Sequence, residues 1–113
     1  MILGVGVDIV ENRRIKLELA RRILSEAENE VLISFNLDNR KIEYLAGRFA
    51  AKEAIYKALS QVDIEVLIRD IIILDDDSGR PKCISPKYIG KRINISISHE
   101  REYSVAFAVV EGE

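Results

Sequence analysis

The amino-acid sequence predicts an α+β fold, in which a mainly antiparallel sheet packs against one long helix and shorter helices. Residues 40–59 are dense in Ala, Leu, Glu, Lys and Arg, which favour a long helix. Four other segments are rich in β-branched residues, as strands are: 2–10, 70–74, 93–98 and 103–110. Because only residues 99–102 separate the last two segments, with a turn at 100–102, we expect these to pair as a hairpin.

The first predicted strand carries an acidic residue among apolar ones. Alternation places one apolar set on one face and a mixed set on the other: Val5, Val7 and Ile9 opposite Gly6, Asp8 and Val10. A carboxylate in a strand is costly to bury unless a cation or hydrogen-bond donors compensate it. Asp8 therefore stands out as a candidate functional residue. The alternative is a strand-end aspartate that faces water or caps the next helix.

Two shorter helices are predicted between the first strand and the long helix. The apolar residues Ile15, Leu19 and Ile23 are spaced four apart, which predicts a helix over residues 12–24. Ser25 and Glu28 have the spacing of a capping box, which predicts a second helix from there to about residue 34. The turn predicted at residues 75–81 rests on its Asp, Ser, Gly and Pro residues.

Composition excludes several classes of protein. The 113 residues suit one domain spanning 1–113, and the net charge of −2, from 17 basic and 19 acidic residues, argues against a generic nucleic-acid binder. With Cys83 the single cysteine and His99 the single histidine, no intramolecular disulfide, multi-cysteine site or multi-histidine metal centre can form. No apolar run is long enough to span a membrane and no signal-peptide pattern is visible, so we expect a cytoplasmic protein.

Three local patterns are candidates for chemistry, and each has a simpler structural interpretation. On the long helix, Glu53 and Lys57 share a face with Phe49, which is also the spacing of an ordinary ion pair. His99 ends the strand of residues 93–98, where a structural histidine is the alternative. Residues 12–24 hold five basic residues against one acidic residue, a local charge of +4 that suits either a solvated face or an acidic partner.

Taken in order, these motifs resemble the holo-[acyl-carrier-protein] synthase family, the small-subunit type of 4′-phosphopantetheinyl transferase. The resemblance rests on four segments that run nearly end to end: Gly6–Glu11, Gly47–Lys57, Gly79–Pro81 and Ile97–His99. The pattern Phe-x-x-Lys-Glu-x-x-x-Lys with an upstream Gly-x-Asp is the specific part. The chain departs from the family at Ser60–Asp63, where relatives have a glycine-containing turn, and in a shorter segment after the first predicted helix.

The resemblance implies an enzyme of fatty acid biosynthesis that transfers phosphopantetheine from coenzyme A to a serine of acyl carrier protein, releasing adenosine 3′,5′-bisphosphate. Asp8 and Glu53 would hold one Mg²⁺, which binds few protein carboxylates together with phosphates and waters. Either carboxylate is a candidate general base. Lys57 would contact the phosphates and stabilise the leaving nucleotide, and three further residues are candidate phosphate contacts: Arg48, Lys52 and His99.

The same resemblance implies two protein partners. Acyl carrier protein would dock at Arg13 and Arg14, with Arg21 and Arg22 as plausible additions. A second copy of the chain is the other partner, because small enzymes of this type form homotrimers with each coenzyme site between neighbouring subunits. Two alternatives remain open at this point: a non-catalytic module that binds an acidic protein through its basic first helix, and a Mg²⁺-dependent phosphotransferase that acts on a small molecule.

Overall fold

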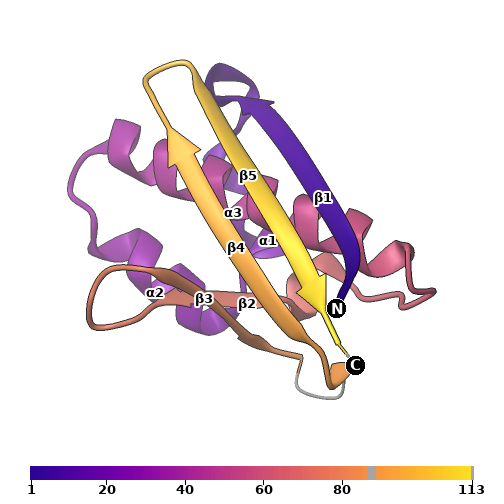
Figure 1. The fold of residues 1–113 in the computed structure, drawn as a ribbon. Helices are drawn as coiled ribbons and strands as arrows, with labels where there is room; N and C mark the ends of the chain where they lie inside the picture. Colours follow the sequence, from indigo (N-terminus) through magenta and orange to yellow (C-terminus); the bar gives the residue numbers. More distant parts are fainter. Residues whose placement is uncertain (87–88, 113) are drawn as a thin grey trace.

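The computed structural model describes residues 1–86 and 89–112. Three strands form an antiparallel sheet in the order β1–β5–β4: β1 (Ile2–Glu11), β4 (Arg92–His99) and β5 (Tyr103–Glu111) (Figure 1). Two further strands, β2 (Ile72–Asp75) and β3 (Pro81–Ser85), form a separate hairpin. The α+β class, the predicted strands and the pairing of the last two strands are confirmed. Strand β3 is additional, because a segment that begins with proline carries a weak strand signal.

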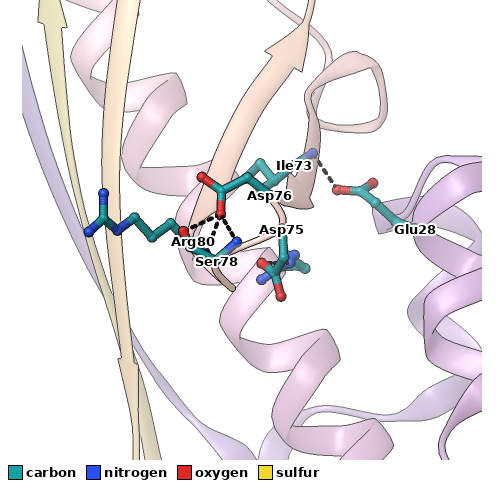
Figure 2. A network of polar contacts seen from close by, with 7 residues as sticks. Glu28, Ile73, Asp75, Asp76, Ser78 and Arg80 are labelled. Atoms are coloured by element: carbon teal, nitrogen blue, oxygen red, sulfur yellow. Dashed lines mark hydrogen bonds and ion pairs between the residues drawn. The ribbon is translucent and has the colours of Figure 1, made fainter.

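The turn between β2 and β3 is built around one aspartate. Asp76 Oδ1 accepts hydrogen bonds from the backbone N–H groups of Ser78 and Arg80, at 2.9 and 3.0 Å, and from the Ser78 hydroxyl at 2.7 Å (Figure 2). Gly79 has a φ of +85°, which glycine adopts at little cost. These local preferences explain why the turn was predictable from residues 75–81.

Two of the three predicted helices are present. Helix α2 (Glu26–Ser34) begins with the predicted capping box, in which the Ser25 hydroxyl accepts from the Glu28 N–H and the Glu28 carboxylate accepts from the Ser25 N–H. Helix α3 (Asp38–Ser60) covers one face of the three-stranded sheet, and it lies behind the sheet in Figure 1. Among the described residues, no helix is long and apolar enough to cross a membrane.

The single helix predicted over residues 12–24 is wrong. The segment forms two 3₁₀ turns, η1 (Asn12–Arg14) and η2 (Leu17–Leu19), followed by the four-residue helix α1 (Ala20–Ile23). Asn12 is buried, and its side-chain amide donates to the carbonyls of Glu100 and Arg101 while its oxygen accepts from Ser104. These bonds attach the start of the segment to the β4–β5 turn. The apolar spacing therefore reflects burial of separate short turns.

Helix α3 lies in direct contact with the backbone of β1. A Cβ atom at Gly4 would lie 2.2 Å from the carbonyl oxygen of Ala58, and one at Gly6 would lie 2.0 Å from that of Ala54. Real Cβ atoms do not approach so closely, so this packing requires glycine on the strand and small residues on the helix. The alanines of α3 pack here with apolar residues of β5 and β2 to form the main core: Ala106, Ala108, Val110 and Ile73.

The opposite face of the sheet is apolar and exposed. Alternation along β1 holds as predicted, but the apolar set points away from α3: Val5, Val7 and Ile9 are 42%, 54% and 65% exposed. On the neighbouring strand β5, Tyr103 and Phe107 are 43% and 48% exposed on the same face. Gly4, Gly6 and Asp8 occupy the inner face, where the close approach of α3 leaves no room for larger apolar side chains.

We predict that Gly6→Ala destabilises the protein while Gly47→Ala does not. The added methyl at Gly6 meets backbone, which cannot yield without moving α3, and overpacking of this kind costs about 1–3 kcal/mol. At Gly47 the methyl meets one side-chain atom, Cγ2 of Ile97 at 3.2 Å, which has to shift by only a few tenths of an ångström, and alanine is favoured over glycine in a helix by about 1 kcal/mol. Urea denaturation of both variants checks this. A Gly6→Ala protein as stable as the wild type would contradict the described packing.

Candidate functional site

A lysine and two carboxylates meet where α3 crosses the free edge of β1. Lys57 Nζ donates to Asp8 Oδ1 at 3.1 Å and to the carbonyl of Val7 at 3.0 Å. Glu53 precedes Lys57 by one helical turn on the same face of α3, near enough to Asp8 and Lys57 for both charges to act on its carboxyl group. The Asp8 side chain is 18% exposed and that of Lys57 is 51% exposed, so the group is open to solvent. The structure therefore brings together Asp8, Glu53 and Lys57.

The electrostatics of this group suit a cation. Burial, and secondly the negative charge of Asp8, raise the pKa of Glu53, while Lys57 opposes the rise. A cation placed between two such carboxylates relieves their repulsion, and Mg²⁺ commonly takes one or two carboxylates together with phosphates and waters. Among the described residues, no cluster of three or more His, Cys, Asp or Glu side chains forms a closed metal site. The donor set of Asp8 and Glu53 thus fits an open magnesium site.

Arg48 and His99 belong to a second group, which surrounds a cavity of about 450 Å³ between the first half of α3, the end of β4 and the end of β2. Arg48 Nη2 donates to Asp75 Oδ1 at 2.8 Å, and its side chain is 8% exposed. His99 Nδ1 lies 3.3 Å from Glu43 Oε2. The cavity is therefore lined by two groups able to bind an anion, each paired with a carboxylate.

The two groups point to different sides of α3. Arg48 and Glu53 are five residues apart, which corresponds to a rotation of about 140° around a helix. Arg48 accordingly reaches the β2–β3 hairpin, while Glu53 lies beside β1. None of the residues Asp8, Glu53 and Lys57 lines the cavity at Arg48. A single long ligand would have to pass over α3 to contact both groups within one copy of the chain.

Lys52 does not join either group, contrary to its expected role as a phosphate contact. Its side chain is fully buried, and its ammonium donates to Glu28 Oε1 and to the carbonyl of Ile23, both at 2.6 Å. Burial lowers the pKa of Lys52, and the hydrogen bond to Glu28 opposes this. Lys52 in this structure links α3 to α1 and α2, on the side away from the solvent.

The sequence did not predict that Glu28 is the buried partner of Lys52. It is fully buried, and its second oxygen accepts from the Ile73 N–H of β2 at 2.8 Å (Figure 2). The capping-box spacing identified Glu28 as a helix-capping residue, and it is one. Its bonds to Lys52 and Ile73 join segments 24 and 45 positions away, which no local pattern indicates.

The basic segment near the N-terminus is exposed. Arg13 forms an ion pair with Glu11 and its side chain is 85% exposed. Arg14, Arg21 and Arg22 are exposed as well, on η1 and α1. The charge that the sequence concentrates between residues 12 and 24 is therefore available at the surface, although the segment is not one helix.

Comparison with known proteins now assigns the chain to a family. A sequence model of the 4′-phosphopantetheinyl transferase superfamily matches residues 4–108. The chain belongs to this superfamily. It is 42% identical to a holo-[acyl-carrier-protein] synthase of Geobacillus sp. (strain WCH70) over 98% of both chains, and 42% identical to that of Staphylococcus saprophyticus over 98% of this chain and 99% of the relative.

Solved structures of the superfamily have the same fold. The crystal structure of a holo-(acyl-carrier-protein) synthase from Bacillus anthracis, in complex with CoA (3′,5′-ADP), matches with a TM-score of 0.86 and 40% identity, over 100% of this chain and 99% of that one. The Helicobacter pylori synthase in complex with coenzyme A matches with a TM-score of 0.78 and 31% identity, over 95% and 99% of the two chains. The chain therefore shares the fold of these synthases over nearly its whole length.

We predict that Glu53→Gln is stabilising near neutral pH. Because the pKa of Glu53 in the folded protein is raised above its ordinary 4.5, the native state binds this proton more tightly than the unfolded chain does. The stability of the wild type should therefore fall as the pH rises from about 4.5 through the raised pKa, and glutamine removes that loss. Thermal unfolding at pH 4 and pH 7 without divalent cations measures it. The exposed Glu65→Gln is the control, and a Glu53→Gln advantage that is absent at pH 7 would contradict the prediction.

Proposed function

We propose that the protein transfers the 4′-phosphopantetheine group from coenzyme A to a serine hydroxyl of apo-acyl carrier protein. The carrying observation is that the family motif residues Asp8, Glu53 and Lys57, from β1 and α3, meet in one solvent-accessible group. Similarity to holo-[acyl-carrier-protein] synthases along nearly the whole chain supports this activity. We propose that the reaction takes place in the cytoplasm and that it provides active carrier protein for fatty acid biosynthesis.

Each residue of the group has a part in this reaction. Asp8 and Glu53 would hold Mg²⁺, which would supply charge neutralisation at the pyrophosphate of coenzyme A. The Lys57 ammonium, held beside Asp8 by the Val7 carbonyl, contacts phosphate oxygens and stabilises the departing adenosine 3′,5′-bisphosphate. The serine oxygen attacks the phosphorus next to the pantetheine, the bond to adenosine 3′,5′-bisphosphate breaks, and the serine proton passes to a carboxylate of this group, Asp8 or Glu53.

The cavity at Arg48 and His99 suits a second phosphate of the same coenzyme. Coenzyme A carries a pyrophosphate and a separate 3′-phosphate, and the first is assigned to Asp8, Glu53 and Lys57. Arg48 supplies a planar guanidinium with donors beyond the one that Asp75 uses, and His99 supplies an imidazole at the rim. Lys52 is not carried forward as a phosphate contact, because its ammonium is buried against Glu28.

A homotrimer whose binding sites form between subunits would bring these two groups of residues together. Because Arg48 and Glu53 point to different sides of α3, one coenzyme reaches both only if they come from neighbouring subunits. The exposed apolar face of Val5, Val7, Ile9, Tyr103 and Phe107 supplies a surface for self-association. We therefore propose that each site combines Asp8, Glu53 and Lys57 of one subunit with Arg48 and His99 of the next.

The exposed arginines suit an acidic carrier protein. Arg13 and Arg14 come just after β1, five and six positions after Asp8, so a partner bound there would lie near the proposed magnesium ligands. Electrostatic complementarity of this kind mainly raises the association rate and the specificity. Arg21 and Arg22 on α1 extend the same surface.

We predict that the purified protein, given apo-acyl carrier protein, coenzyme A and Mg²⁺, adds phosphopantetheine to the carrier, as intact-protein mass spectrometry would show. Asp8→Ala and Glu53→Ala should reduce the rate at least a hundredfold, since metal-assisted phosphoryl transfer depends on charge stabilisation worth several kcal/mol. Circular dichroism should show both variants folded. Failure of the wild type to modify any cognate carrier would favour a non-catalytic module that binds acidic proteins.

We predict that two inactive variants complement one another. Asp8→Ala and Arg48→Ala subunits, co-expressed, should form mixed assemblies in which about a quarter of the sites combine an intact Asp8 with an intact Arg48, by random pairing around a closed ring. Activity should return to about that fraction of the wild-type rate. Each variant expressed alone is the control. Absence of recovery in assemblies shown to be mixed would place both groups in one subunit.

A further inference from the structure

Two buried polar atoms on adjacent turns of α3 lack hydrogen-bond partners among the residues that the structure describes. They are the hydroxyl of Tyr44 and Nε of Arg48, four residues further on. Both residues line the cavity at His99. A buried polar group without a partner is costly, and a protein retains one where it serves a ligand or where a water satisfies it.

The side chains around these atoms hold them in fixed positions. The Arg48 guanidinium lies over the Tyr44 ring, 4.6 Å from its centroid, while Nη2 is bound to Asp75. The other side of the Tyr44 ring meets Phe35, with centroids 5.6 Å apart and planes tilted by 52°. Arg48 and Tyr44 are therefore oriented before any ligand arrives, which lowers the entropic cost of binding.

The chemistry of the two atoms specifies what they can bind. Arg48 Nε–H is a donor only, and the Tyr44 hydroxyl stays protonated because burial raises its pKa. Two unpartnered donors on neighbouring residues of one cavity suit an acceptor with several oxygens, such as a phosphate. The carboxylates at this cavity, Glu43 and Asp75, are each already paired, with His99 and Arg48.

We propose that Tyr44 is a further binding residue for coenzyme A, whose hydroxyl donates to the 3′-phosphate beside Arg48 Nε. The proposal rests on the proposed function, because the pyrophosphate is assigned to Asp8, Glu53 and Lys57 on the other side of α3. It makes the cavity selective for nucleotides that carry a phosphate at the 3′ position. It also explains why a hydroxyl is present at a place where phenylalanine would pack equally well.

The test is Tyr44→Phe, with Tyr56→Phe as the matched control, since Tyr56 is an exposed tyrosine on the same helix. Calorimetric titration measures the dissociation constants for coenzyme A and 3′-dephospho-coenzyme A. Tyr44→Phe should weaken coenzyme A about tenfold, or about 1.4 kcal/mol, and leave the dephospho form unchanged. The melting temperature of the free variant should be unchanged or higher, because a buried unpaired hydroxyl has been removed. Tyr56→Phe should match the wild type throughout.

Three outcomes would overturn the proposal. Wild-type affinity of Tyr44→Phe for coenzyme A would mean that water alone satisfies the hydroxyl. An equal loss for both nucleotides would place the contact away from the 3′-phosphate. Both results leave the proposed transferase activity standing, because the wild type still modifies the carrier. A wild type that binds neither nucleotide and modifies no carrier would remove the proposed function together with the role of Tyr44.

Discussion

The backbone contact between β1 and α3 is the constraint on which the rest of the structure depends. Gly4 and Gly6 let the carbonyls of Ala58 and Ala54 approach the strand more closely than any side chain permits. At that separation the Lys57 ammonium reaches both Val7 and Asp8. Val5, Val7 and Ile9 of β1 point to the outer face, since only glycine fits where Ala54 and Ala58 of α3 approach the strand. The close approach of α3 to β1 thus accounts both for the position of Lys57 beside Asp8 and for the exposed apolar surface.

A second interaction holds the opposite side of α3. The buried pair of Lys52 and Glu28 ties the helix to α1, α2 and, through the Ile73 N–H, to β2. Removal of one partner of such a pair leaves an uncompensated buried charge, which typically costs about 3–5 kcal/mol. Lys52 and Glu53 are neighbours in the sequence, yet a rotation of about 100° per residue puts the first in the core and the second at the surface.

These two contacts leave the functional groups on different sides of one helix. Asp8, Glu53 and Lys57 lie at β1 and the facing side of α3, and the cavity with Tyr44, Arg48 and His99 lies between α3, β2 and β4. A chain of 113 residues has little material to enclose a ligand as long as coenzyme A. Association of subunits through the exposed face of β1 and β5 would bring the two groups of residues together. The apolar outer surface would then compensate for the small size of the chain.

The sequence by itself determined the fold class, the strands β1, β2, β4 and β5, the capping box of α2 and the extent of α3. Alternation and helical spacing also singled out Asp8 in its strand and placed Glu53 and Lys57 on one helix face, because these are local properties that the chain carries wherever it packs. Their roles as candidate site residues came from the resemblance to the synthase family. Tertiary structure alone decided the broken segment at residues 12–24, the partner of Lys52, the additional strand β3 and the outward face of β1. Each of these depends on atoms far away in the sequence, such as the carbonyls that bind Asn12, and local periodicity contains no information about them.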